Sequence, residues 1–468
     1  MEAKFFKVSA LTAAMVGAVV SMPVMADQPL VPENIINQEI EFFSESKISG
    51  NFNLWMRARD RAGYDATTRK DTKKATNLDH GSAFVNLGFN SGYIADTVGL
   101  DLVIYSTFDM WQNGGADHEM NFWGVNNPYN MEPKDSSCSN IWTDCNDNGV
   151  SFATANAKFK FGDVATAKLG YFQPSVPSTL GVNWSFAPGT YLGGEVGLNF
   201  DQLALGLVYA AEYKAPWFKS TYKFQEKLRN GTFEDAGDVY SLGARYTFAN
   251  GISVDAGFGG LTEGDRKNAH VKVKGTTDGG LFWSPQVYVV DDNEQYDSTA
   301  YQLAFLSSYS TGPYTLRGEA TYTSAESFDD KLVGNMAYRL TQAYGGSNGA
   351  YDIWWNNRSD YNHDGEFAVF GSLARDFADY GANGFNAGVS GVYGFGAKAD
   401  GYKELKEYAF SVFANYAIQA GALKDANISM YYTQYYNDSD AGNWAPYTNA
   451  FNDETDYKLI LTIPFNVK

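Results

Sequence analysis

Apolar and polar residues alternate with a period of two along most of the chain. The first clear instance covers residues 49–61, where even positions are mostly apolar and odd positions are polar, aromatic or basic. Successive side chains of a β-strand point to opposite sides, so this segment is predicted to be a strand with one apolar and one polar face. Segments 82–90 and 100–111 repeat the pattern. We therefore expect Leu54 on the apolar side and Arg57 on the polar side.

Further segments with the same alternation bring the expected number of strands to about eighteen. They lie near residues 152–161, 166–173, 190–200, 203–213, 237–248, 251–262, 267–275, 281–290, 299–310, 313–323, 366–377, 384–396, 404–418, 426–436 and 455–467. The connections alternate between short turns and long polar segments, the latter at 112–150, 214–236, 324–365 and 437–454. This pattern predicts an all-β protein of the cell outer membrane, a single transmembrane antiparallel β-barrel with short periplasmic turns and long extracellular loops.

The N-terminus is predicted to be an export signal. A basic head is followed by a short apolar stretch and small residues that end at Ala26, which is the pattern of a secretory signal peptide. We expect residues 1–26 to be the signal peptide, residues 27–47 a periplasmic extension with a short helix near 33–43, and residues 48–468 the barrel domain.

Composition and charge narrow the function. The chain contains 32 Tyr, 32 Phe and 47 Gly but only 13 Pro, and this suits strands that face lipid on one side and water on the other. A net charge of −19 argues against a nucleic-acid partner, because phosphate binding requires a basic face. The four histidines are scattered and form no catalytic pattern, so we expect a protein that is not an enzyme and has no cofactor.

Charged residues with inward parity are the first candidates for a substrate path. Arg57, Arg59 and Arg61 stand two residues apart, which places all three on the inner face of one strand. Acidic residues of inward parity are expected to face them across the lumen, where a transverse field would orient dipolar solutes; they are Asp101, Asp109, Glu195 and Glu319. The alternative is that these charges are simply solvated wall residues of a water-filled barrel.

Aromatic residues are the second set of candidates, since sugar rings stack on aromatic faces. Inward parity or a position in a polar loop selects Trp55, Trp111, Trp184, Phe186, Trp354 and Trp355. The alternative for such residues is the aromatic girdle at the membrane interface. Arg358, in the same loop as the adjacent tryptophans, completes the predicted path.

Two loop features were weighed for other roles. Cys138 and Cys145 lie close together in a polar stretch of an exported chain, and this favours a disulfide within an extracellular loop. The stretches 144–149 and 360–365 resemble the start of a calcium loop. Both lack the glutamate at the twelfth position and the flanking helices, so no metal site is predicted.

Long, irregular stretches resemble the OprD family of porins, and most closely its chitoporin members. They are RARDR at 57–61, GYFQPSVPSTLGVNWSFAPGTYLGGEVG at 170–197, EYKAPW at 212–217 and SNGAYDIWWNNRSDYNHDGE at 347–366. The resemblance covers nearly all of the mature chain. It implies a monomeric barrel with a basic ladder, inward-folded loops that include residues 173–190, and passive uptake of chitin-derived oligosaccharides.

Two alternatives stay open at this point. Other members of the family carry basic amino acids or carboxylates, so membership alone does not fix the solute. A protein of another class, an outer-membrane adhesin or structural barrel with a plugged lumen, would share the strand pattern. A polar inner face along its whole height favours a conducting channel among outer-membrane lipids over a plugged barrel.

Overall fold

The computed structural model describes residues 42–65, 67–68, 70–114, 148–182, 186–216, 218, 220–329, 332–342, 345–402, 405–438 and 452–467. The predicted signal peptide, most of the predicted periplasmic extension, both cysteines of the predicted disulfide and Trp184 lie outside the described residues. Among the described residues, no helix has the length and apolar character needed to cross a membrane.

Eighteen strands of the described chain form one closed antiparallel barrel. They are β1 (Lys47–Asp65), β2 (Lys70–Asn90), β3 (Val98–Gly114), β4 (Gly149–Phe161), β5 (Ala165–Phe172), β6 (Thr190–Phe200), β7 (Leu203–Lys214), β11 (Val239–Thr247), β12 (Ser253–Leu261), β13 (Lys267–Thr276), β14 (Phe282–Asp291), β15 (Ala300–Thr311), β16 (Tyr314–Ser324), β17 (Phe367–Asp376), β18 (Phe385–Ala397), β19 (Leu405–Ala417), β20 (Asn427–Asn437) and β21 (Glu454–Asn466). The predicted fold class is therefore confirmed.

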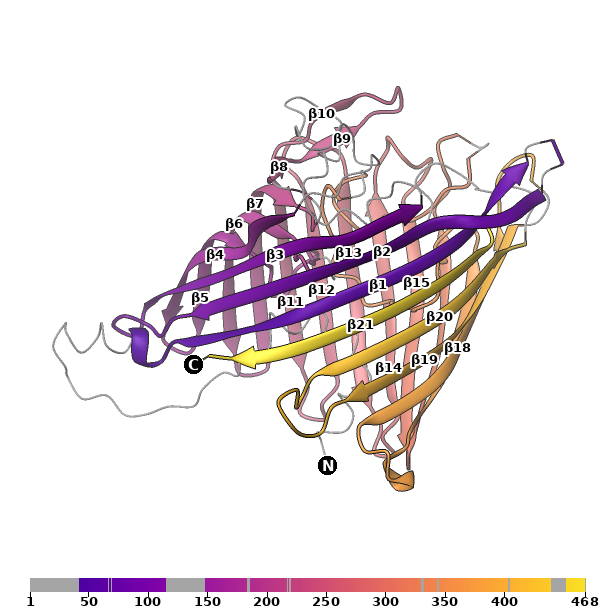
Figure 1. Cartoon of the computed structure of the whole chain (residues 1–468). Coiled ribbons are helices and arrows are strands. Elements are labelled where there is room, and N and C mark those ends of the chain that lie inside the picture. The colour runs from indigo at the N-terminus through magenta and orange to yellow at the C-terminus, as the bar shows by residue number, and fades with distance from the viewer. Residues whose placement is uncertain are drawn as a thin grey trace.

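Closure joins the two ends of the barrel domain. β1 pairs with β21 from Ser49 opposite Asn466 to Arg61 opposite Glu454, and Figure 1 shows the indigo and yellow strands side by side. Closure leaves no unpaired sheet edge, as a membrane-spanning sheet requires. Three short strands, β8 (Tyr222–Lys223), β9 (Gln225–Lys227) and β10 (Phe233–Asp235), lie outside the barrel wall in the connection between β7 and β11. The short helix η2 (Ala378–Tyr380) follows β17.

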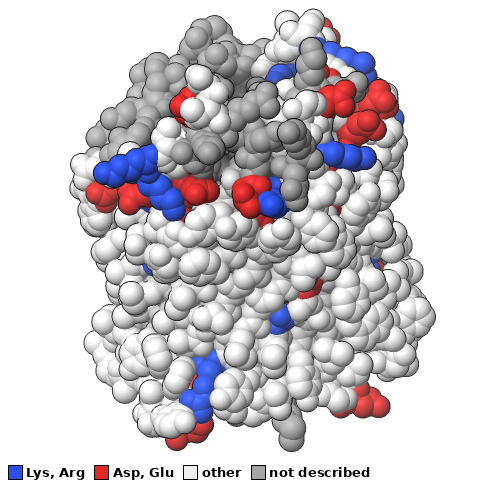
Figure 2. Space-filling view, turned by 90° about the vertical axis from the view of Figure 1, so that its right-hand side faces the viewer, with Lys and Arg blue, Asp and Glu red and all other residues white. Residues whose placement is uncertain are grey.

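The two faces of the strands differ as the alternation predicts. Large apolar side chains are exposed on the outside, including Leu207, Leu242, Val271, Leu303 and Phe410. Figure 2 shows a broad band around the middle of one side with few charged residues, and clusters of charge above and below it. Inward residues are polar and covered, with Arg57 only 3% exposed. A barrel with this outer band fits a bilayer.

Strand β2 is longer than predicted. It begins at Lys70 rather than near residue 82, and its added part pairs with β1 as far as Asp65 opposite Lys70. The added segment is polar on both faces, so it carries no alternation for a sequence pattern to detect. A strand that continues beyond the lipid needs no apolar face.

Trp111 was predicted to line the substrate path, but it lies on the outer face of the barrel. The pairing of β2 with β3 places Asp109 opposite Ser82 but Trp111 opposite Gly81, so Met110 forms a bulge. A bulge adds one residue and reverses the parity beyond it. Gly81 lies opposite Met56 on the outer face, and the Trp111 ring covers it. Trp111 is 39% exposed and belongs to the outside of the barrel.

Candidate functional site

A row of four glycines forms a trough on the inner wall. Gly197 of β6 lies opposite Gly206 of β7, which lies opposite Gly243 of β11, which lies opposite Gly257 of β12. The connection between β5 and β6, residues 173–189, is here called the first inward loop, and its residues 176–179 lie in this trough. A Cβ added at Gly206 would lie only 2.2 Å from the carbonyl oxygen of Pro177, and a Cβ added at Gly243 would lie only 2.3 Å from the same oxygen. The loop backbone can therefore reach the wall only because these positions have no side chain.

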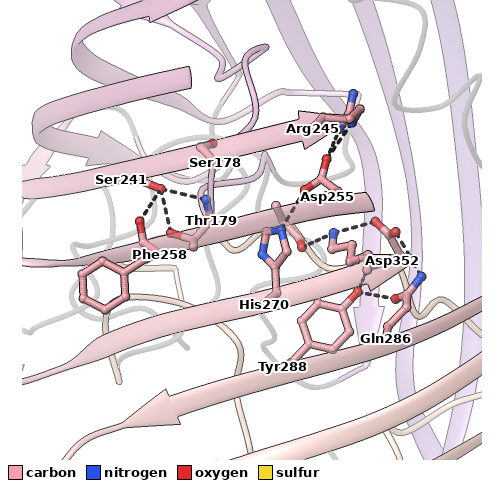
Figure 3. Close-up of polar contacts among 12 residues, drawn as sticks. Ser178, Thr179, Ser241, Arg245, Asp255, Phe258, His270, Gln286, Tyr288 and Asp352 are labelled. Carbon is pink, nitrogen blue, oxygen red and sulfur yellow. Dashed lines mark hydrogen bonds and ion pairs between the residues drawn. The ribbon is translucent and has the colours of Figure 1, made fainter. Parts of the chain in front are cut away.

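Polar contacts fix the first inward loop in the trough. The backbone N–H of Thr179 donates to the Ser241 hydroxyl at 2.7 Å, as Figure 3 shows. At the other side of the trough, the N–H of Ser175 donates to the Glu195 carboxylate at 2.8 Å. Lys168 lies 2.9 Å from the same carboxylate. Glu195 was predicted to line the path, and the structure gives it the added task of holding the loop.

The far end of the first inward loop reaches the opposite wall. The ring of Phe186 lies 6.0 Å from the ring of Trp55 on β1 and 5.4 Å from that of Phe84 on β2. Because Thr179 contacts β11 and Phe186 contacts β1 and β2, the loop crosses the barrel interior. Trp55 is 4% exposed beneath it. Trp55 and Phe186, both predicted to line the substrate path, are thus in contact. Their contact packs the first inward loop against the barrel wall.

Residues 325–366, the second inward loop, join the first one. Leu180 and Gly349 form an isolated β-bridge. The Ala350 N–H donates to the carbonyl of Thr179 at 2.8 Å, and the Gly181 N–H donates to that of Asn348 at 3.1 Å. The two loops therefore hold each other by backbone hydrogen bonds and together narrow the lumen.

Asp352 fastens the second inward loop to the wall of β13 and β14. Its carboxylate lies 3.0 Å from the ammonium of Lys272 and 2.7 Å from that of Lys274. Its N–H donates to the Tyr288 hydroxyl at 3.0 Å, a contact drawn in Figure 3. Burial alone would raise the pKa of Asp352, but the two lysines lower it well below its ordinary value. The carboxylate is therefore charged over the physiological pH range.

A buried polar chain backs this attachment. His270 lies 2.9 Å from a carboxylate oxygen of Asp255 and 2.7 Å from the Tyr338 hydroxyl. Arg245 pairs with the same aspartate, as Figure 3 shows. Tyr338 belongs to the second inward loop, so this chain also connects the loop to the wall.

The adjacent tryptophans of the second inward loop differ in exposure. Trp355 is 8% exposed and stacks on Phe370 at 5.4 Å with an interplanar angle of 4°. Its indole N–H donates to Glu319 at 2.7 Å. Trp354 is 37% exposed, and its carbonyl accepts a hydrogen bond from Arg317 at 3.1 Å. Of this pair, Trp355 is an anchor, and Trp354 presents its ring to solvent.

The predicted arginine ladder is paired with the closing strand. Arg57 makes two hydrogen bonds to Asp456, at 2.8 and 3.0 Å. Glu454 receives Arg61 and Arg358, the latter at 2.7 Å. Arg59 donates to Asn77 at 2.6 Å and lies 4.0 Å from Glu454. The structure therefore brings the four predicted arginines together on one wall.

Glu454 and Asp456, on the inner face of the last strand, are site residues that were not predicted from the sequence. In that strand, the parity opposite to the apolar residues carries Glu454, Asp456 and Lys458, so the signal was available. With Lys458 3.5 Å from Asp456, this wall carries the cations of Arg57, Arg59, Arg61, Arg358 and Lys458. Among the described residues, Glu454 and Asp456 are the carboxylates around which these cations gather.

The predicted acidic residues have basic neighbours in their own part of the barrel wall. Asp101 pairs with Lys158 at 3.0 Å, and Glu319 pairs with Arg317 at 2.7 Å. Glu195 pairs with Lys168, as described above. The transverse field across the lumen stays a prediction. Asp109 also meets a neighbouring strand, where it accepts a hydrogen bond from Ser82 at 3.1 Å.

A closed barrel with an apolar outer band and a polar lumen narrowed by inward loops defines an outer-membrane porin. The chain belongs to the OprD family, because residues 40–467 match the model of the outer membrane porin, OprD family. It is 36% identical over 456 residues to the chitoporin of Escherichia coli (strain K12), across 91% of this chain and 92% of that relative. The predicted family and the outer-membrane location are thus confirmed.

Solved structures show the same fold at low identity. OccK9 (OpdG) of Pseudomonas aeruginosa superposes with a TM-score of 0.70 at 17% identity, over 91% of this chain and all of that one. OccAB3 of Acinetobacter baumannii gives a TM-score of 0.66 at 15% identity, again over 91% of this chain and all of that one. These similarities concern the barrel architecture alone.

Proposed function

We propose that this porin admits chitin-derived oligosaccharides to the periplasm by passive diffusion. The observation that carries the proposal is the similarity to a protein named chitoporin, at an identity well above that of the solved porins. A channel for sugars needs weak binding groups along a polar path, so that the solute both enters and leaves.

The exposed ring of Trp354 supports the proposal. Its neighbours Asp352 and Trp355 contact the inner wall, while Trp354 is 37% exposed. A sugar ring stacked there gains about 1 kcal/mol beyond simple burial. Arg61 and Arg358, whose side chains are 24% and 12% exposed, can supply hydrogen-bond donors to hydroxyl and acetamido oxygens.

Current recordings in a planar bilayer test the proposal. Chitohexaose is expected to block the ion current transiently, and maltohexaose far less. Trp354→Ala should shorten the blocks about fivefold, which corresponds to the loss of about 1 kcal/mol. Trp111→Ala is the matched control, because that ring faces outwards and its loss should leave the blocks unchanged. Chitohexaose that never interrupts the current would refute the sugar assignment.

A second candidate solute is a carboxylate. The arginine side chains gathered beside β1 and β21 favour it, since guanidinium groups bind carboxylates with two parallel hydrogen bonds. The same recordings distinguish the two candidates. A small carboxylate or lysine that blocks where chitohexaose does not would replace the sugar proposal, while the porin class would stand.

The resemblance to the family also leads us to infer a monomer among outer-membrane lipids. Native mass spectrometry of the detergent-solubilised protein should then give the mass of a single mature chain. A trimer mass would contradict this inference without affecting the proposed solute.

A further inference from the structure

Three potential metal ligands meet at the base of the second inward loop. His363 and Glu366 stand at the end of this loop, and Glu407 comes from β19. The Nδ1 atom of His363 lies 2.9 Å from Oε2 of Glu366 and 3.3 Å from Oε1 of Glu407. One ligand atom from each residue lies within 4.8 Å of the others, and all three side chains are fully buried. The three side chains have no exposed surface, so they are not part of the predicted substrate path.

A divalent cation would neutralise the charge of the cluster. With both carboxylates ionised, a proton on His363 leaves one negative charge among three fully buried side chains. Buried charge is costly unless it is neutralised. A doubly charged ion bound by a neutral imidazole and two carboxylates makes the site neutral.

Two buried polar atoms beside the cluster have no hydrogen-bond partner. They are Oε1 of Glu366 and the hydroxyl of Tyr361, which is coupled electrostatically to both carboxylates. A water molecule or an ion can satisfy buried polar atoms of this kind, and here they adjoin three potential metal ligands. Gly394 makes room for the Glu366 carboxylate, because a Cβ at that position would lie 2.1 Å from Oε1.

The second carboxylate is already oriented for coordination. Tyr435 donates to Oε2 of Glu407 at 2.6 Å, and Ser359 donates to Oε1 at 2.8 Å. Hydrogen bonds from outer groups hold metal-binding carboxylates in this way. The calcium-like stretch around it has other tasks, since Asp364 accepts a hydrogen bond from the Ala325 N–H at 2.8 Å and Asn362 donates to the Met336 carbonyl at 2.6 Å.

We propose that His363, Glu366 and Glu407 bind a divalent first-row transition-metal ion of the zinc type. An imidazole nitrogen with two carboxylates suits zinc and its neighbours, whereas calcium takes oxygen ligands only. The ion would tie the end of the second inward loop to β19 and so fix the loop against the barrel wall.

Zinc binding to the purified full-length porin in detergent, first stripped with a chelator, tests the proposal. Titration calorimetry should show one saturable zinc site per chain. His363→Gln and Glu407→Gln should each weaken it at least about tenfold. His80→Gln is the matched control, because it removes a buried histidine outside the cluster and should leave zinc binding intact. Zinc binding that persists in both cluster variants would overturn the site.

A measurement on the wild-type protein covers the case in which the variants do not fold. Cobalt loaded into the stripped porin should give the visible absorption bands of a low-coordinate nitrogen and oxygen site, and zinc should displace it. Absence of such bands would refute the proposal. Saturable calcium binding without zinc binding would assign the metal to the stretch 360–365 instead, and would equally overturn it.

Discussion

The two sides of the lumen are built on opposite principles. On the wall of β6, β7, β11 and β12, a row of glycines leaves room for the backbone of the first inward loop. The wall of β1 and β21 consists of long charged side chains, held in place by Asp456 and Glu454. The first wall fixes how wide the channel is, and the second supplies the groups that line it. The two walls are connected by the inward loops, through Phe186 against Trp55 and through Arg358 at Glu454.

The largest expected effect is at the charged wall. Asp456→Asn removes the partner of Arg57 in a pair whose side chains are each 1% exposed. Breaking a buried pair by removing one partner costs about 3–5 kcal/mol, so the thermal unfolding temperature should fall clearly.

The surface pair of Lys160 and Asp96, 3.2 Å apart with side chains 31% and 57% exposed, provides the control. Asp96→Asn should cost at most about 1 kcal/mol. Heat unfolding followed by tryptophan fluorescence compares the two variants. Equal losses would mean that the Arg57–Asp456 pair is solvated as if it lay at the surface.

The next effect is at the glycine wall. Gly206→Val places a side chain where the Pro177 carbonyl lies, and overpacking of this kind costs about 1–3 kcal/mol. The seated position of the loop should then be populated about 5 to 150 times less relative to displaced positions, and single-channel conductance should rise.

Gly318→Ala controls for the loss of a glycine as such, since no atom lies nearer than 3.8 Å to a Cβ there. It should conduct like the wild type. A Gly206→Val channel that folds and conducts normally would show that the loop does not set the width.

The smallest effect concerns pH at the attachment of the second inward loop. The pKa of Asp352 is lower in the folded protein than in the unfolded chain, where it is about 3.9. Its ionised carboxylate therefore stabilises the fold fully above the unfolded-state pKa. This stabilisation is lost only as pH falls through the lower folded-state pKa. Current noise should therefore stay constant from about pH 7 to pH 5. Asp352→Asn should add brief closures already at neutral pH, because an exposed or half-exposed pair contributes up to about 1 kcal/mol.

Alternation predicted the strands because lipid on one side and water on the other impose it. Alternation did not predict the polar start of β2, which has no lipid-facing side. It also placed Trp111 on the wrong face, because a bulge at Met110 reverses the parity of the residues after it. The arginines of β1 were found because they share one strand. Their partners Glu454 and Asp456 lie at the other end of the chain and become neighbours only when the barrel closes.

Contacts of the inward loops could not be read from the sequence. Alternation says that Trp55 faces the lumen, but not that Phe186 covers it. Nor does it say that Trp355 is covered by stacking while Trp354 is exposed. Glycine is disfavoured in strands, but many strands of this chain contain it, and only the alignment of these four across neighbouring strands distinguishes them. Such an alignment depends on register, which the sequence of a single strand does not contain.

The glycine trough has a consequence for how such channels diversify. The trough receives the backbone carbonyl oxygen of Pro177 and, beside it, the side chains of Val176 and Thr179. Loops that differ outside these few positions can therefore occupy one unchanged barrel as exchangeable inserts. Selectivity can be rewritten by replacing the insert, while the wall that supports it remains the same.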